Sequence, residues 1–346
     1  MRRAIGLAEK YDPSPNPRVG AVIVRDGKVI GEGAHRRAGL PHAEINALLS
    51  CASPAGADMY VTLEPCCHYG KTPPCADALI EAGIARVFIG MSDPDPRVAG
   101  GGIKRLRKAG IATECGILEE ECRRLNREYI THRTLKRPYV VIKQAMTLDG
   151  RTATRSGDSK WISCPDSRRL VHELRNKYDA VLVGGNTFRR DDPFLNVRLD
   201  KAELKQPVRI VLTENIPAGT GAHIFSEGGG KTVFACGGAC EGTEEREGCT
   251  LLHYLKGDLG SLLKTLASLD ILSVMVEGGA ATAGSFIKAD LWDEILFFYA
   301  PLLLNDREAP GQGGGEAPEF IKDARRVRLG EVCRIGEDVM LRAYRE

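Results

Sequence analysis

The sequence has little of several features that mark particular protein classes. Aromatic residues make up only 6% of the 346 residues, and no apolar run approaches the roughly 20 residues that a membrane-spanning helix needs. The net charge is +2, with 21 basic against 16 acidic residues up to position 137 and 27 against 30 after it. A nucleic-acid-binding protein needs a strong positive excess to neutralise phosphates, and neither half has one that large. The composition therefore argues against a membrane protein and against a nucleic-acid partner.

The N-terminus and the cysteines favour the cytoplasm. The first ten residues, MRRAIGLAEK, return to charge too soon to form the apolar core of a signal peptide. Eleven cysteines are an odd number for a disulfide framework. They fit free thiols and metal ligands in a reducing compartment better. We therefore expect a cytoplasmic protein.

Strand and helix signals alternate through the first part of the chain, which predicts a mostly parallel sheet covered by helices. Gly27 marks a hairpin-type turn after the first strand. The expected strands cover 19–24, 59–63, 87–90 and 111–113, and the expected helices cover 41–49, 75–82, 102–108 and 119–127. The polar segment 131–138 ends in proline and predicts a domain boundary, which gives domains 1–137 and 138–346.

The second part also has the pattern of an α/β domain. Apolar runs predict strands at 139–143, 180–183, 208–212, 232–235, 273–276 and 294–299. The glycine-rich stretch 311–315 is interpreted as a surface loop, because a phosphate-binding glycine loop should lie between a strand and a helix.

A candidate zinc site has the clearest pattern in the sequence. His42 lies in Pro-His-Ala-Glu, Cys66 follows a strand signal, and Cys75 opens a predicted helix. Zinc deaminases hold the metal with one His and two Cys and keep a nearby Glu that is not a ligand. Three protein ligands leave a position for water, whose pKa the metal lowers towards neutrality. Glu44 then transfers the proton to the leaving ammonia.

Two features of this pattern leave alternatives open. The usual second half is Pro-Cys-x-x-Cys, whereas eight residues separate Cys66 from Cys75 here. Cys67 offers a competing sulfur, and Cys67 or His68 could close a purely structural site as a fourth ligand. The plainest alternative is a set of buried thiols beside a core histidine.

The longer spacing nevertheless resembles one family. The run TLEPCCHYGKTPPC at 62–75 and the run NPRVG at 16–20 resemble the deaminase half of the bifunctional deaminase/reductases of riboflavin biosynthesis. The resemblance implies a cytidine-deaminase-like α/β/α fold. It also implies that Asn16 contacts the pyrimidine and that His35, His68 and Lys71 lie around the substrate and its phosphate. Without the resemblance, Asn16 reads as a turn former and Lys71 as a solvated lysine.

The second half resembles the reductase of the same family, which has a dihydrofolate-reductase-like α/β fold. The similar stretches are KQAMTLDGR at 143–151, SGDSKWI at 156–162 and DDP at 191–193. With the deaminase runs, the resemblance covers essentially the whole chain. It implies zinc-dependent hydrolytic deamination of 2,5-diamino-6-ribosylamino-4(3H)-pyrimidinone 5′-phosphate. NADPH-dependent reduction of the ribosyl to the ribityl group then gives 5-amino-6-(5-phosphoribitylamino)uracil.

Two glycine turns in this half fit a dinucleotide. Gly184-Gly185 and Gly278-Gly279 each follow a predicted strand, and such turns expose backbone N–H groups to phosphate. Packing also places glycines at strand ends. Neither turn has the G-x-G-x-x-G pattern, which argues against an ordinary Rossmann domain.

The resemblance also implies a set of contacts in the reductase. NADP(H) would contact Ala145, Trp161, Thr187, Asp191, Gly279, Ala280, Ala281, Thr282, Ala283, Gly284 and Ser285. The sugar phosphate would meet Ser159, Arg175, Leu195, Arg198 and Glu277, and Lys143 would also reach the substrate. Without the family, Trp161 reads equally well as a core residue and Lys143 as a solvated strand-end lysine.

One position departs from the family pattern. Thr213-Glu214-Asn215 follows a strand where the family usually has Asp-Ser near the adenosine ribose. Glu214 would repel a 2′-phosphate but could accept a hydrogen bond from a 2′-hydroxyl, which leaves NADPH against NADH open. Arg189 and Arg190 are candidates to offset this charge.

Two rival functions remain from the sequence alone. A nucleic-acid deaminase would need basic and aromatic surface and the short cysteine spacing. A non-catalytic zinc-binding module would need a fourth protein ligand. The sequence leaves open whether the chain forms a homo-oligomer, how hydride is delivered and which groups serve as acid or base in the reduction.

Overall fold

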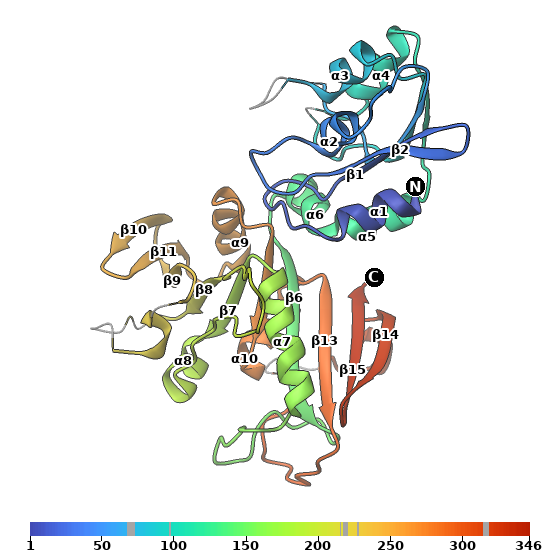
Figure 1. Cartoon of the computed structure of the whole chain (residues 1–346). Helices are drawn as coiled ribbons and strands as arrows, with labels where there is room; N and C mark the ends of the chain where they lie inside the picture. Colours follow the sequence, from blue (N-terminus) through green and yellow to red (C-terminus); the bar gives the residue numbers. More distant parts are fainter. Residues whose placement is uncertain (68–72, 97, 215, 217–220, 227, 314–317) are drawn as a thin grey trace. The chain divides into compact units, whose positions relative to one another are not determined.

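The chain folds into two compact units, Met1–Lys136 and Arg137–Glu346 (Figure 1). The computed structural model describes all residues except 68–72, 97, 215, 217–220, 227 and 314–317. Two predicted site residues, His68 and Lys71, therefore lie outside the described residues. Arg137, predicted as the last residue of the first domain, is bound within the second unit by the carboxylate of Asp293, at 2.6 and 2.8 Å.

The first unit contains a five-stranded sheet in the order β2-β1-β3-β4-β5. Its strands are β1 (Gly20–Arg25), β2 (Lys28–Ala34), β3 (Asp58–Leu63), β4 (Arg86–Met91) and β5 (Ala112–Cys115). Strands β3, β4 and β5 are parallel, but β1 is antiparallel to both of its neighbours. The expectation of a mostly parallel sheet was wrong for this unit. The expected hairpin at Gly27, where φ is +74°, pairs β2 antiparallel with β1, and β1 is also antiparallel to β3.

Six helices accompany this sheet in the described part of the first unit. They are α1 (Arg2–Ala8), α2 (Ala43–Leu49), α3 (Cys75–Glu81), α4 (Gly101–Lys108), α5 (Glu119–Leu125) and α6 (Arg127–Leu135). Helix α6 ends at Leu135, inside the segment 131–138 where the domain boundary was predicted, and the two units divide just after it, between Lys136 and Arg137. Residues Tyr129, Thr131 and His132 of α6 are buried. This packing stabilises a helix that the polar sequence alone does not predict.

A close contact between α2 and β2 fixes the start of α2. A Cβ atom on Gly33 would lie only 2.3 Å from the carbonyl oxygen of Ala43 and from the backbone nitrogen of Ala47. Ala43 and Ala47 are themselves fully buried small residues. The helix can therefore lie directly on the strand, which holds the first turn of α2 in one position.

The second unit contains a ten-stranded sheet in the order β10-β11-β9-β8-β7-β12-β6-β13-β15-β14. The strands are β6 (Tyr139–Thr147), β7 (Ala180–Gly184), β8 (Val208–Leu212), β9 (Thr232–Gly238), β10 (Gly242–Arg246), β11 (Cys249–Leu255), β12 (Ser273–Glu277), β13 (Glu294–Ala300), β14 (Val327–Ile335) and β15 (Asp338–Arg345). The strands from β11 to β13 in this order are all parallel, while β10, β15 and β14 pair antiparallel at the edges. All six predicted strands of this half are confirmed.

Helices pack against both faces of this sheet, as expected for parallel strands. They are α7 (Pro165–Lys177), α8 (Gly185–Asp191), α9 (Leu259–Ser268) and α10 (Ala280–Lys288), together with the short 3₁₀ helices His223–Phe225 and Ile321–Asp323. Residues of α9 and α10 join one hydrophobic cluster, and residues of α7 and α8 join the other. No helix among the described residues is both long enough and apolar enough to cross a membrane.

The predicted glycine-rich loop at 311–315 is only partly described. Gly311 forms an isolated β-bridge with Arg151, and residues 314 and 315 lie outside the described residues. Gln312 donates a hydrogen bond to the Tyr299 hydroxyl at 3.1 Å. The described part therefore packs against the ends of β6 and β13.

Candidate active sites

Three side chains of the first unit form a candidate metal site. His42 is the N-cap residue of α2, Cys66 follows β3, and Cys75 is the first residue of α3. The His42 Nδ1 atom lies 3.6 Å from the Cys66 sulfur and 3.3 Å from the Cys75 sulfur, and all three ligand atoms lie within 4.8 Å of one another. Ligand atoms in a tetrahedral zinc site are about 3.5–3.8 Å apart, given Zn–N near 2.0 and Zn–S near 2.3 Å. The set therefore fits zinc.

The position of Pro41 differs from the expectation. Helix α2 begins at Ala43, so Pro41 precedes the N-cap and does not occupy the first turn. Its carbonyl oxygen instead accepts hydrogen bonds from the Asn46 side chain at 3.1 Å and the His35 ring at 3.2 Å. These hydrogen bonds help to fix Pro41, the residue directly before the metal ligand His42.

A hydrogen bond between the two cysteine side chains shifts their pKa values in opposite directions. The backbone N–H of Cys75 donates to the Cys66 sulfur at 3.2 Å. The hydrogen bond with the Cys75 side chain, reinforced by His42, lowers the pKa of Cys66 to about 4. The same hydrogen bond and burial raise the pKa of Cys75. Both sulfurs can be thiolates together only if a cation binds between them, which is the chemistry that zinc provides.

Cys67 does not compete for this site. Its sulfur lies towards α4, where a Cβ atom on Gly101 would be 2.6 Å away, and it is not part of the ligand group. Burial raises the pKa of Cys67, which disfavours a thiolate. His68 is not among the described residues. Within the described part of the chain, the metal site has three protein ligands, the number typical of a catalytic zinc.

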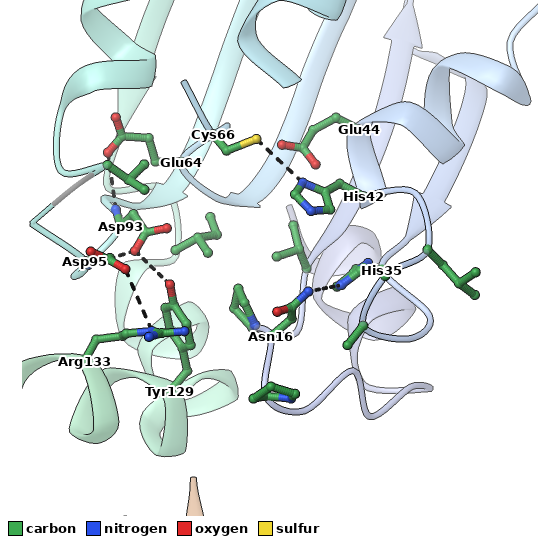
Figure 2. Close-up of a pocket in the computed structure, with 18 residues that line it drawn as sticks. Asn16, His35, His42, Glu44, Glu64, Cys66, Asp93, Asp95, Tyr129 and Arg133 are labelled. Carbon is green, nitrogen blue, oxygen red and sulfur yellow. Dashed lines mark hydrogen bonds and ion pairs between the residues drawn. The ribbon is translucent and has the colours of Figure 1, made fainter. Parts of the chain in front are cut away.

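Glu44 lies beside the three ligands. Figure 2 shows its carboxylate turned towards Cys66 and His42. The residue is 4% exposed, and burial, assisted by the charge of Cys66, raises the pKa of Glu44 to about 7. A carboxyl group with this pKa can accept and release a proton near neutral pH. This is the behaviour expected of the proton-transfer residue.

Two of the metal ligands, His42 and Cys66, line a cavity of about 410 Å³ that Asn16 and His35 also line (Figure 2). The His35 ring contacts the carbonyl oxygen of Pro41 through Nδ1 and lies 2.9 Å from the Asn16 side-chain nitrogen through Nε2. Burial lowers the pKa of His35, so its neutral form donates from Nδ1 to the carbonyl and accepts from Asn16 at Nε2. Asn16 is thereby held with its oxygen available to a ligand.

The opposite wall of this cavity is acidic and was not predicted (Figure 2). Asp93 accepts hydrogen bonds from the Tyr129 hydroxyl at 3.3 Å and the Asp95 backbone at 2.9 Å, and Asp95 lies 3.9 Å from Arg133. Burial raises the pKa of Asp93 to about 6. The one available signal was the pair of aspartates in Asp-Pro-Asp, directly after the carboxyl end of a parallel strand.

The second unit contains a buried charged cluster at the carboxyl end of β12. Glu277 is 7% exposed and forms two hydrogen bonds with the Arg175 guanidinium, at 2.6 and 3.0 Å. Burial alone would raise the pKa of Glu277, but the Arg175 charge holds it below its usual value. Lys143, the register partner of Glu277 on β6, is half-buried with its ammonium 5.6 Å from the Phe298 ring. Three of the predicted substrate residues therefore lie together.

Arg198 and Leu195 lie on a segment that this cluster holds in place. Arg175 donates to the carbonyl oxygen of Asn196 at 3.1 Å, and the Arg198 guanidinium donates to the Asn196 side chain at 2.6 Å. The Arg198 backbone N–H donates to His172 on α7 at 3.3 Å. Leu195 has a positive φ of 50° and is 2% exposed, so its side chain belongs to the core. Asn196 and His172 were not predicted.

The two glycine turns lie side by side, because β7 and β12 are neighbours in the sheet. A Cβ atom on Gly184 would lie 2.3 Å from the Thr282 hydroxyl oxygen. A Cβ atom on Gly278 would lie 3.1 Å from the methyl group of Thr187. Each turn therefore packs against a threonine of the other, and we call the pair of turns the glycine cradle. It lies at the carboxyl ends of two parallel strands, where sheets of this kind bind their ligands.

The other predicted cofactor residues differ in accessibility. Trp161 is 69% exposed, so it is not a core residue, and the Arg168 guanidinium lies 4.7 Å from its ring centre. Ala145 and Ser159 are half-buried, and the carbonyl oxygen of Asp191 accepts from Lys160 at 3.4 Å. On α10, Ala281 and Ser285 are exposed, Ala280 is half-buried, and Ala283 and Gly284 are buried. Ala283 is completely buried in the core, so only its backbone could face a ligand.

Two family models together match most of the chain. The model described as the cytidine and deoxycytidylate deaminase zinc-binding region matches residues 1–91. The model described as the RibD C-terminal domain matches residues 138–341. The zinc-region match contains the three metal ligands His42, Cys66 and Cys75, and also Glu44.

Similar proteins extend over nearly the full length. The riboflavin biosynthesis protein RibD of Aquifex aeolicus is 42% identical over 346 residues, which covers 99% of this chain and 96% of that one. RibD of Escherichia coli is 40% identical, with 99% and 95% covered. The crystal structure of a diaminohydroxyphosphoribosylaminopyrimidine deaminase/5-amino-6-(5-phosphoribosylamino)uracil reductase from Thermotoga maritima has a TM-score of 0.90 and 37% identity, covering 100% of this chain and 97% of that one.

Proposed function

The chain belongs to the RibD family of bifunctional deaminase/reductases of riboflavin biosynthesis, and on that premise we propose which residues carry its two reactions. It is a zinc-dependent deaminase and an NADPH-dependent reductase. We assign the deaminase to residues 1–137 and the reductase to residues 138–346. The observation that carries the proposal is the three-ligand site of His42, Cys66 and Cys75 beside buried Glu44.

The proposed substrate of the first reaction is 2,5-diamino-6-ribosylamino-4(3H)-pyrimidinone 5′-phosphate. When bound by His42, Cys66 and Cys75, zinc supplies Lewis-acid chemistry that makes water nucleophilic near neutral pH. Glu44 takes the proton of the attacking water and passes it to the amine that leaves as ammonia, because its pKa of about 7 allows both steps.

The cavity walls orient the pyrimidine in this proposal. Asn16, fixed by His35, presents its side-chain oxygen to an exocyclic amine of the ring. Asp93 and Asp95 add acceptors for amines or hydroxyls on the opposite wall. The family resemblance assigns His68 and Lys71 to the substrate phosphate, and both lie outside the described residues.

The second reaction reduces the ribosyl to the ribityl group, and the product is 5-amino-6-(5-phosphoribitylamino)uracil. When bound, NADPH supplies the hydride. Lys143 donates a hydrogen bond to a ribosyl oxygen, since Glu277 lies beside it as a counter-charge. Arg198 and Ser159 bind the phosphate, while Arg175 and Leu195 hold the Arg198 segment.

The cofactor lies along the cradle formed by the two glycine turns in this proposal. The residues assigned to it are Ala145, Trp161, Thr187, Asp191, Glu214 and Gly279 to Ser285. Trp161 offers an exposed ring face, and Thr187 borders Gly278 and Gly279. We place the enzyme in the cytoplasm, because a reducing compartment keeps Cys66 and Cys75 as thiols for the metal.

Incubation with the diaminopyrimidine nucleotide tests the two-reaction assignment. Without NADPH we expect release of ammonia and accumulation of the deaminated ribosyl nucleotide. With NADPH we expect oxidation of the cofactor to follow ammonia release and the ribityl product to form. Ammonia, NADPH absorbance and product mass are measured on the same samples. NADPH oxidation without prior ammonia release would contradict the proposed order.

The glycine cradle gives a second test. Replacing Gly184 with Ala places a methyl group 2.3 Å from the Thr282 hydroxyl oxygen, so the start of α10 must shift. We expect NADPH to bind about tenfold more weakly, because backbone donors at the cradle lose their alignment. Fluorescence titration with NADPH measures the affinity. Gly242→Ala is the control, since nothing lies within 4 Å of a Cβ atom there.

A further inference from the structure

The residue that departs from the family pattern, Glu214, lies next to the glycine cradle. Strand β8 pairs with β7 so that Leu212 is opposite Gly184. A Cβ atom on Gly185 would lie 2.6 Å from the Thr213 hydroxyl oxygen, so Thr213 borders the first glycine turn and Glu214 follows it. A dinucleotide that extends from the cradle across the carboxyl end of β8 would therefore pass beside Glu214.

A lysine neutralises this carboxylate. The Lys256 ammonium lies 2.8 Å from a Glu214 oxygen, and the two side chains are 70% and 64% exposed. Lys256 follows β11, and β9 lies between β11 and β8 in the sheet. Strand β9 ends in Gly237 and Gly238, and a Cβ atom on Gly237 would lie 3.3 Å from the Cα atom of Lys256. The glycines leave room for Lys256 to approach Glu214.

Arg189 adds a second positive charge at the same place. Its guanidinium donates to the Asn186 side chain at 2.6 Å and to the Thr213 hydroxyl at 3.4 Å. Arg190, the other candidate from the sequence, has its guanidinium beside Gly157 instead. A Cβ atom on Gly157 would lie 2.6 Å from it. Around Thr213 the charges of Arg189, Lys256 and Glu214 therefore sum to a net positive value.

We propose that Lys256 neutralises Glu214 so that Arg189 can attract a 2′-phosphate, which makes this end of β8 select NADPH over NADH. A 2′-phosphate carries up to two negative charges, so an unpaired carboxylate beside it would oppose binding. When Glu214 is paired with Lys256, their charges cancel. The electrostatic potential at the carboxyl end of β8 is then set by the positive charge of Arg189. The inference rests on the proposed placement of the cofactor in the cradle.

Binding of 2′,5′-ADP and 5′-AMP to the full chain tests this inference without hydride chemistry. These nucleotides differ in the 2′-phosphate alone, and calorimetry gives both dissociation constants. We expect the unchanged protein to prefer 2′,5′-ADP, and Lys256→Met to weaken 2′,5′-ADP about fivefold while 5′-AMP changes less than about twofold at low salt. High salt should remove most of this difference, because the charges are exposed.

The matched control is Lys231→Met. Lys231 pairs with Glu245 at 3.1 Å, with side chains 59% and 70% exposed, so the pair resembles Lys256–Glu214. It lies at the amino end of β9, away from the edge where the cradle lies. We expect both nucleotides to bind this variant as they bind the unchanged protein. Selective loss of 2′,5′-ADP in the control would overturn the inference.

A double variant separates neutralisation from direct contact. If Lys256 acts by neutralising Glu214, adding Glu214→Gln to Lys256→Met restores the preference for 2′,5′-ADP to within about twofold of the unchanged protein. Arg189→Gln should weaken 2′,5′-ADP in either background. The inference would be overturned if Lys256→Met weakened 2′,5′-ADP equally in the protein with Glu214 and in the Glu214→Gln protein. It would also be overturned if Lys256→Met alone left the preference for 2′,5′-ADP over 5′-AMP unchanged.

The outcome also distinguishes this inference from the proposed function. If both nucleotides bind and Lys256→Met leaves their ratio unchanged, only the selectivity role of Lys256 is wrong. If neither nucleotide nor NADPH binds the unchanged protein, the placement of the cofactor in the second unit is wrong, and the inference fails with it.

Discussion

Replacing Glu44 with Gln is expected to lower the rate of ammonia release by about 10²–10⁴-fold while zinc remains bound. Glutamine keeps the shape of the side chain but cannot accept or release the proton. The ligands His42, Cys66 and Cys75 remain in place, so metal affinity should change little. The loss should appear in kcat more than in KM, because Glu44 acts on the reacting atoms and the cavity walls bind the substrate.

Metal analysis and ammonia release are measured on the same preparation of the Glu44→Gln protein. Glu81→Gln, at the exposed end of α3, is the matched control and should retain full activity. Full deamination by Glu44→Gln would assign the metal a structural role. Loss of zinc together with activity would instead show that Glu44 holds the ligands and does not transfer the proton.

Removing zinc with a chelator is expected to abolish ammonia release and to leave NADPH oxidation on pre-deaminated substrate intact. The ligands belong to the first unit, whereas Lys143, Glu277 and the glycine cradle belong to the second unit, which has its own hydrophobic clusters. Chelation removes the Lewis acid from the first unit only.

The chelation experiment needs two controls: the protein must stay folded, and the loss of ammonia release must be reversible. Circular dichroism before and after chelation checks the fold, and added zinc should restore ammonia release. The Cys75→Ser variant provides a second route to the same state, because a serine hydroxyl binds zinc far less well than a thiolate. If both activities disappear while the protein stays folded, the model of two separate sites is wrong.

The elements that were predicted from sequence are those whose burial shows in their composition. Strands β7 and β12 are buried along their whole length, and a run of apolar residues announces such a strand. Strand β10 is fully exposed and most of β14 is, so neither carries such a run. Helix α1 was missed because the residues it buries, Ala4 and Ala8, are too small to mark an apolar face.

The metal site was predictable for a different reason. Few side chains bind zinc, and His42, Cys66 and Cys75 stand in a recognisable order beside Glu44. The acidic wall was not predictable in this way. Asp93 follows β4, whereas Tyr129 and Arg133 come from α6, and only packing brings them together.

The Glu214 position illustrates a further limit of sequence reasoning. The sequence places the carboxylate correctly after β8, but its partner Lys256 is 42 residues further along the chain and follows a different strand. The order β11-β9-β8 is set by the parallel connections of the sheet. Arg189 and Arg190 were the candidates named from the sequence, and of these two Arg189 contacts Thr213.

The hydrogen bonds between Cys66 and the first residues of α3 have a consequence for protein engineering. Cys66 accepts the Cys75 backbone N–H at its sulfur and the Ala76 backbone N–H at its carbonyl oxygen, at 3.2 and 3.1 Å. Cys66 and the start of α3 are thus held together by hydrogen bonds that do not depend on how many residues lie between Cys66 and Cys75. Loops of other lengths can therefore be grafted between Cys66 and Cys75 while the metal centre is preserved. Such grafts replace His68 and Lys71, which the family resemblance assigns to the substrate phosphate, so they are a route to a different substrate.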